Sequence, residues 1–315
     1  MKSQAVLLAT WRDGLFVIGD EGQSQELASV PIKWLAPDGH GGALVIVGPN
    51  SLSARSRSGE WTTIALSEFE LSCCMAVGET IYVGTDDARM LRLNDATGVL
   101  EPIGAFDSVP GRDAWFAGSA VIDGQRVGPP LGIRSLTANS TGRILFANVH
   151  VGGIPRSIDG GRSWFPTINI DSDVHEVCAH PAHPEIVVAA SAVGLCMSRD
   201  SGETWTIDTE GLHATHCYAV AISGDDVLVS ASQDPFGAPG RCYRRPLRPD
   251  GSLEALEGGL PAWTQGMVDT RCIAATGPFV ALADKGGNLY GSDDFGRTWS
   301  SIGTGLPSPS SILIC

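Results

Sequence analysis

Seven short apolar runs along the chain each begin with a polar or reactive side chain. The runs start at Lys33, Cys73, Arg134, His175, Tyr218, Arg271 and Ser311. Lysine and arginine bind anions, and the planar guanidinium of arginine binds a carboxylate or phosphate through two parallel hydrogen bonds. Histidine and tyrosine transfer protons. Brought together, these positions would form a site for a small anion with acid–base groups beside it.

Histidines in neighbouring segments suggest a second kind of chemistry. His150 ends one strand-like run, His175 begins the next, and His213 and His216 precede the run that begins at Tyr218. Imidazole nitrogen atoms are common ligands of divalent metal ions. His150, His175 and His216 are therefore candidate ligands of a divalent metal that keeps an open position for water. The alternative is that each imidazole only forms hydrogen bonds within its own loop.

Roles follow from these residue types. His175, Tyr218 and His150 are the candidate catalytic acids and bases. The candidate substrate-binding residues are Lys33, Cys73, Arg134 and Arg271. The alternative is a polar neck in which internal Asp and Glu neutralise the arginines and water fills the remaining space.

The spacing of the seven runs indicates a repeat protein. The steps between their first residues are 40, 61, 41, 43, 53 and 40. Most repeats also contain further strand-like runs, such as 143–147, 185–189 and 226–230. Four short strands in about 40 residues are typical of a β-propeller blade. The first strand of a blade lines the channel, which predicts that the seven first residues surround one channel mouth.

One turn pattern, S-x-D-x-G-x-[ST]-W, occurs three times, at 157–164, 198–205 and 292–299. Its Asp and Ser side chains can accept hydrogen bonds from turn N–H groups that no strand ladder satisfies. Its Gly suits a positive φ. Its Trp opens the next strand and can pack between blades. The motif aspartates Asp159, Asp200 and Asp294 are therefore predicted to cap turns rather than to catalyse.

The three copies resemble the Asp-box, or BNR repeat, of the sialidase-like superfamily of β-propellers, which includes WD40/YVTN/BNR-like repeat proteins. In those families the Asp-box lies away from the active site, so the resemblance implies a site on the opposite face. A true sialidase is not expected, because the Arg-Ile-Pro motif of sialidases is missing near the start of the chain. The resemblance implies a hydrolase or lyase that acts on a small anionic or glycan-like substrate. The alternative is a non-catalytic scaffold, similar to photosystem II assembly factors, that binds an acidic protein segment.

The two ends of the chain predict how the fold closes. Residues 5–30 offer only three strands, and the last strand-like run, within 309–315, supplies the missing innermost one. Pairing these ends removes an open sheet edge. The sequence thus predicts an all-β protein: a single domain, 1–315, with seven four-stranded antiparallel blades. The alternative is six blades with an additional hairpin.

The longest insertion, 106–132, is predicted to act as a lid. Trp115 and Phe116 within it are candidates for stacking on a sugar or aromatic ligand. The alternative is that these aromatic residues only attach the insertion to the scaffold.

Composition narrows the partners. The chain has 315 residues, 43% of them hydrophobic, and a formal net charge of −14. This charge disfavours nucleic acid and acidic membrane surfaces, and no apolar stretch approaches the length of a membrane span. Eight cysteines without a secretory signal suggest reduced thiols and a cytoplasmic location. The expected partner is a small anionic ligand or carbohydrate, and a protein partner remains open.

Overall fold

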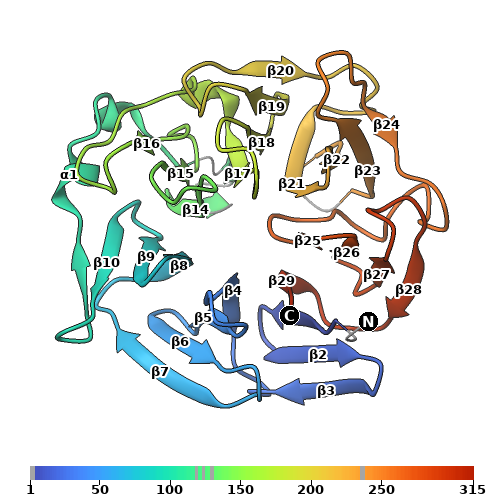
Figure 1. The fold of residues 1–315 in the computed structure, drawn as a ribbon, viewed down its shortest axis with the longest axis horizontal. Coiled ribbons are helices and arrows are strands. Elements are labelled where there is room, and N and C mark those ends of the chain that lie inside the picture. The colour runs from blue at the N-terminus through green and yellow to red at the C-terminus, as the bar shows by residue number, and fades with distance from the viewer. Residues whose placement is uncertain (1–3, 118–119, 123–124, 128–130, 235–237) are drawn as a thin grey trace. The chain divides into compact units, whose positions relative to one another are not determined.

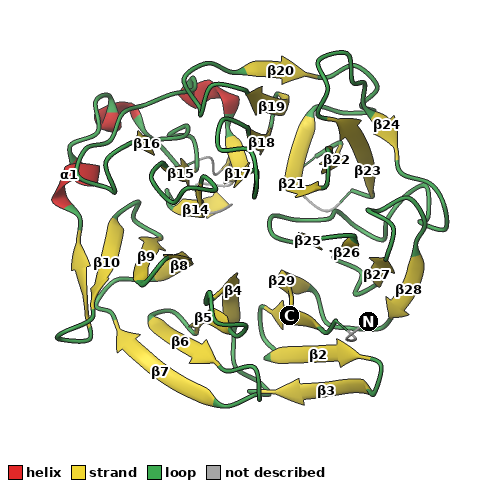
Figure 2. Cartoon of the chain, viewed as in Figure 1, coloured by secondary structure: helices red, strands yellow, loops and turns green. Residues whose placement is uncertain are grey.

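The computed structural model describes residues 4–117, 120–122, 125–127, 131–234 and 238–315. The chain is all-β and has the fold class of a seven-bladed β-propeller with antiparallel blades, as predicted. Helical segments in the described residues are short: α1 (Gly104–Asp107), η1 (Arg112–Ala114) and η2 (Ile170–Ser172), drawn red in Figure 2. None of these helices is long and apolar enough to cross a membrane.

Residues distant in sequence gather into two compact units. The first unit comprises Met1–Leu35, Val188–Met197 and Ile207–Cys315, and the second comprises Ala36–Val187 and Ser198–Thr206. A single domain spanning 1–315 stays a prediction.

The first blade joins both ends of the chain within the first unit. Its hydrogen-bonded order is β29 (Pro309–Ile314), β1 (Val6–Thr10), β2 (Leu15–Gly19) and β3 (Gly22–Glu26). The dark red end of the ribbon in Figure 1 therefore lies beside its blue beginning. Leu8 pairs with Ile312, and every residue of β29 is buried. This confirms the predicted closure by the C-terminal strand.

The next three sheets follow in sequence. The first of them is β4 (Ile32–Pro37), β5 (Ala43–Val47), β6 (Ser51–Arg55) and β7 (Trp61–Leu66). The second is β8 (Leu71–Val77), β9 (Thr80–Thr85), β10 (Met90–Asn94) and β11 (Val99–Pro102). The third is β14 (Ile133–Ala138), β15 (Leu145–Val149) and β16 (Arg156–Ser157), where a single bridge between Arg156 and Phe165 replaces a fourth strand. The insertion before β14 forms a hairpin of β12 (Ala120–Ile122) and β13 (Gln125–Val127).

Three further sheets complete the set. The first is β17 (Val174–Ala179), β18 (Val187–Ser191), β19 (Gly194–Ser198) and β20 (Thr206–Asp208). The second is β21 (His216–Ser223), β22 (Asp226–Ser232), β23 (Gly240–Pro246) and β24 (Glu254–Ala255). The third is β25 (Ile273–Thr276), β26 (Phe279–Ala283), β27 (Leu289–Ser292) and β28 (Ser300–Gly303).

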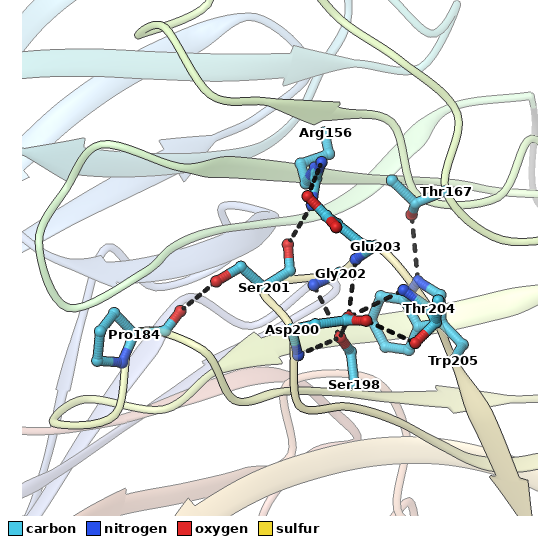
Figure 3. A network of polar contacts seen from close by, with 10 residues as sticks. All are labelled: Arg156, Thr167, Pro184, Ser198, Asp200, Ser201, Gly202, Glu203, Thr204 and Trp205. Carbon is cyan, nitrogen blue, oxygen red and sulfur yellow. Dashed lines mark hydrogen bonds and ion pairs between the residues drawn. The ribbon is translucent and has the colours of Figure 1, made fainter.

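The three repeated turns share one hydrogen-bond network, shown for 198–205 in Figure 3. Oδ1 of Asp200 accepts from the N–H groups of Glu203 and Thr204, and Oδ2 accepts from the Thr204 hydroxyl at 2.6 Å. The N–H of Gly202 donates to the Ser198 hydroxyl. The corresponding bonds recur around Asp159 and Asp294. The motif aspartates cap turns, as the pattern predicted.

The glycine of this turn satisfies two demands at once. Gly202 has a φ of +81°, and a Cβ atom there would lie 2.6 Å from the Phe146 ring. Only glycine meets both the left-handed conformation and this close approach. The ring that it contacts belongs to β15, so the turn packs onto the preceding sheet.

Packing between sheets supplies the core. In the first unit, Trp299 joins a buried cluster with Leu228 of β22 and Leu282 of β26. A second cluster joins Phe16 of β2 to Leu289 of β27. Burying such rings and aliphatic chains contributes about 1.5–3 kcal/mol each, so the blades stabilise one another through their faces.

Candidate functional site

His150, Asp173 and His175 come together in the second unit, where β15 and β17 lie side by side (Figure 1). Nε2 of His150 lies 3.3 Å from Oδ1 of Asp173, and Nε2 of His175 lies 3.8 Å from the same oxygen. The histidine side chains are only 3% and 4% exposed, whereas the Asp173 side chain is 26% exposed. Two buried imidazoles thus share one carboxylate that reaches solvent.

Short local structures position the three side chains. His150 follows β15, and its N–H donates to Gly132 O at 3.0 Å, which extends the strand pairing by one residue. The side chain of Asn169 accepts from the Asp171 N–H and caps η2. The chain leaves η2 at Asp173 and enters β17, whose second residue is His175. The turn η2 therefore places Asp173 beside both histidines.

Two residues of this region, one within the cluster and one directly after His150, have a left-handed backbone. Asp173 has a φ of +46°, and Val151, directly after His150, has a φ of +41°. Positive φ is rare for a β-branched residue, and each such conformation costs about 1–3 kcal/mol. Backbone strain of this kind clusters at functional sites. The strain supports a functional interpretation of the neighbouring side chains.

Asn148 adds an unusual polar group to the same segment. It is fully buried on β15, and neither its amide oxygen nor its amide nitrogen has a hydrogen-bond partner among the described residues. Residues two apart on an extended strand share a face, so Asn148 lies on the face that continues to His150. Leaving a buried amide unsatisfied costs about 1–3 kcal/mol. A polar ligand at this face would relieve that cost.

The spacing of the cluster suits a metal ion. Zinc binds imidazole nitrogen and carboxylate oxygen at about 2.0–2.1 Å with tetrahedral angles, which separates neighbouring ligand atoms by about 3.3 Å. The observed separations from Asp173 are 3.3 and 3.8 Å, and all three ligand atoms lie within 4.8 Å of one another. Small side-chain rotations would bring the three atoms around one cation.

His216 and Tyr218, predicted as a metal ligand and a catalytic residue, lie on β21 in the first unit. Their ring centroids are 5.6 Å apart, and Tyr218 is buried. The parts that His216 and Tyr218 play in a site with His150 and His175 stay predictions.

The predicted anion-binding residues are divided between the units. In the first unit, the Arg271 guanidinium lies 5.0 Å from the centroid of the Trp34 ring and donates to Leu35 O at 3.2 Å. Lys33 is half-buried on β4. In the second unit, Arg134 is half-buried on β14, and Cys73 is fully buried, with its thiol donating to Ile133 O. These placements give Arg271 and Cys73 packing roles, and their contact with substrate stays a prediction.

The described part of the 106–132 insertion packs through its aromatic residues. The Arg112 guanidinium lies 4.7 Å from the centroid of the Trp115 ring, which is buried against Phe106. Phe106 in turn meets Trp164 edge-to-face at 5.1 Å. These contacts fit the alternative in which aromatics attach the insertion to the scaffold. Phe116 is 52% exposed, and residues 118–119, 123–124 and 128–130 lie outside the described part of the lid.

Sequence reasoning brought His150 and His175 together but missed the group between them. Asp173 stands two residues before His175, and a D-x-H spacing was its available signal. On a regular strand such residues point to the same side. Here the left-handed backbone at Asp173 determines the direction of its side chain. No pattern in the sequence predicts that backbone conformation.

Comparisons with known proteins support the fold class alone. No protein-family model matches the chain, and no curated protein matches it either. A crystal structure described as a putative 6-phosphogluconolactonase from Bacteroides fragilis has a TM-score of 0.63 at 11% identity, covering 99% of this chain and 98% of that one. An ancestral GH74 enzyme has a TM-score of 0.61 at 14% identity, covering 85% of this chain and 38% of that one. The GH74 enzyme of Niastella koreensis has a TM-score of 0.61 at 12% identity, covering 95% and 47%. This chain therefore spans less than half the length of either GH74 protein.

Proposed function

We propose that this protein is a hydrolase that opens an ester or lactone bond in a small anionic, sugar-like substrate at the centre formed by His150, Asp173 and His175. The observation that carries the proposal is the pair of buried imidazoles that share one partly exposed carboxylate. The strained backbone at Asp173 and Val151 supports it. The three Asp-box-like turns support a BNR-type propeller, in which such turns stabilise the scaffold and leave the chemistry to other residues.

The ligand set favours ester chemistry over glycoside cleavage. Most glycoside hydrolases use two carboxyl groups on either side of the glycosidic bond. The cluster here offers one carboxylate and two imidazoles. Imidazole groups and histidine-bound metal ions are suited to activating water for attack on a carbonyl carbon. The lactonase name of one structural neighbour points to the substrate class that should be tested first.

The residues divide the reaction between them. Water adds its oxygen to the carbonyl carbon, the bond from that carbon to the ring or ester oxygen breaks, and the leaving oxygen receives the proton. Asp173 orients the imidazoles, and one of them accepts the proton from water and returns it to the leaving oxygen. A divalent cation held by His150, Asp173 and His175 would supply Lewis acidity toward the carbonyl oxygen. Arg134, in the same unit, is the proposed contact for the anionic group of the substrate.

The test is hydrolysis of a small panel of esters and lactones by the purified full-length protein. The panel contains 6-phosphogluconolactone, gluconolactone and a neutral nitrophenyl ester. We expect the anionic lactone to be hydrolysed fastest, and His175→Gln and Asp173→Asn to lower kcat/KM by about 10²–10⁴-fold. Asparagine tolerates the left-handed conformation, so Asp173→Asn removes charge while keeping the backbone. Metal content, measured before and after a chelator, reports whether a divalent cation takes part.

His40→Gln is the matched control, because His40 is an exposed histidine of the same unit. It should leave kcat/KM unchanged. Wild-type protein that hydrolyses no ester or lactone would refute the proposed activity. Full activity in His175→Gln and Asp173→Asn would refute the proposed centre. Full activity after complete metal removal would refute only the proposed role of a divalent cation.

A further inference from the structure

A second cluster of chemically active side chains lies in the first unit. It contains His213, Arg241, Tyr243 and Trp263, which come from three separate segments of the chain. Arg241 and Tyr243 stand two residues apart on β23 and so share a face of that strand. Thr264 fixes its neighbour Trp263 beside the start of β23, because its N–H and hydroxyl both donate to Gly240 O. None of these residues belongs to the proposed hydrolytic centre.

The contacts with Tyr243 favour one tautomer of the His213 ring. The phenol oxygen of Tyr243 accepts from the backbone N–H of His213 at 3.0 Å and lies 2.7 Å from Nδ1 of the same residue. Because the phenol oxygen already accepts one N–H, its own proton is available to Nδ1. Burial and the neighbouring charge of Arg241 lower the pKa of His213, which favours the neutral ring. The remaining proton then sits on Nε2 as a hydrogen-bond donor.

Two buried nitrogen atoms of the cluster lack a hydrogen-bond partner among the described residues. They are Nε2 of His213 and Nε of Arg241. Among the described residues, no carboxylate forms an ion pair with Arg241. Several other cationic side chains do form ion pairs with carboxylates. Those cations are Arg89, Arg112, Arg156, Arg244, Arg245, Arg248, Arg297 and Lys285. An uncompensated guanidinium in a chain of net charge −14 calls for an external anion.

The aromatic side of the cluster is open to solvent. Trp263 is 48% exposed, although a large aromatic ring usually prefers burial. The Arg241 guanidinium lies 5.8 Å from the centroid of the Trp263 ring, and the His213 ring meets Trp263 edge-to-face at 4.8 Å. The exposed indole therefore stands directly beside two N–H donors. A flat apolar surface next to donors suits a ring that carries an acidic substituent.

We infer that His213, Arg241 and Trp263 form a binding subsite for a carboxylate attached to a ring. The carboxylate pairs with the Arg241 guanidinium, the ring packs against the half-exposed Trp263 indole, and His213 borders both. Tyr243 is a positioning residue, since it holds the tautomer of His213. The shared chemistry covers a uronic acid and an aromatic acid, and the experiment separates the two.

Isothermal titration calorimetry with the full-length protein tests the subsite. Glucuronate, benzoate and uncharged glucose are titrated in turn. We expect one or both carboxylates to bind and glucose to bind at least 10-fold more weakly, because it has no anion for Arg241. Arg241→Gln should weaken carboxylate binding by at least 10-fold, and Trp263→Ala should weaken it by about the same factor. Stronger binding of glucuronate identifies the ligand ring as a sugar, and stronger binding of benzoate identifies it as aromatic.

Arg248→Gln is the matched control, since Arg248 is an exposed arginine of the same unit that pairs with Asp250. It should bind like wild type. Thermal melting of each variant shows whether it has folded. If Arg241→Gln does not fold, Arg241→Lys replaces it, because lysine keeps the positive charge but lacks the planar guanidinium. The inference is overturned if wild type binds no carboxylate, if glucose binds equally well, or if folded Arg241 variants bind like wild type. His175→Gln should retain this binding, so the subsite and the proposed hydrolase activity can fail independently.

Discussion

At the scale of single residues, the carboxylate in each repeated turn accepts hydrogen bonds that a neighbouring strand would accept within a sheet. Asp159, Asp200 and Asp294 each accept from two backbone N–H groups and two hydroxyl groups. These donors would otherwise lack partners where the chain reverses between strands. The network is complete within the turn, so the carboxylate has no capacity left for catalysis.

Asp293 and Asp294 allow a direct test of this role, because they are adjacent carboxylates in one turn. Asp294 caps the turn, and Asp293 is exposed. Asp294→Ala should lower the free energy of unfolding by about 2 kcal/mol, since charged hydrogen bonds are lost. Asp293→Ala removes the same charge and should change it by less than about 0.5 kcal/mol. Urea denaturation measures both, and equal effects of the two substitutions would contradict the capping role.

At the scale of elements, β29 links the end of the chain to its beginning. It pairs with β1 over its whole length, and Ile312 and Ile314 enter the buried cluster with Phe16 and Leu289. The Ser310 hydroxyl donates to Ile32 O, and the Ile312 N–H donates to Arg271 O. Without β29, the fully buried strand β1 would present an open edge for aggregation.

Substitution of Ile312 tests how much β29 contributes to stability. Ile312→Ala deletes a fully buried side chain and should lower the free energy of unfolding by about 2–5 kcal/mol. Ile158→Ala makes the same chemical change at a 57% exposed position and should cost less than about 0.5 kcal/mol. Denaturant midpoints of the two variants provide the measurement. A small effect at Ile312 would mean that the chain end contributes little to the first blade.

At the scale of the whole molecule, the sequence predicted the architecture well because the architecture repeats. Spacing near 40 residues, turn chemistry and the missing strand at the N-terminus together indicated seven blades and their closure. The candidate sites were less predictable, because they depend on single departures from regular geometry. Asp173 reaches His150 and His175 through a left-handed backbone. His213, Arg241 and Trp263 meet only after three segments fold together.

The turn aspartates also predict how stability depends on pH. Hydrogen bonds from the Ser163 hydroxyl and N–H lower the pKa of Asp159 to about 2. Burial alone would raise the pKa of Asp200, but hydrogen bonds from Thr204 lower it to about 2. The unfolded value is about 3.9, so the unfolded state binds protons first as pH falls. The stabilisation from these carboxylates is therefore complete above about pH 5 and is lost between about pH 4 and pH 2.

A double variant, Asp159→Asn with Asp200→Asn, isolates this contribution from the other carboxylates. Asparagine keeps an acceptor oxygen in the turn but cannot titrate, so the variant should be less stable than wild type at pH 7. The difference should shrink as pH falls and be mostly lost by about pH 2, where about half of the wild-type carboxylates are protonated in the folded state. Urea unfolding at pH 7, 4 and 3 gives the two curves. Parallel curves, with a constant gap at every pH, would show that the turns lose packing rather than charge, and that acid unfolding begins at other carboxylates of this acidic chain.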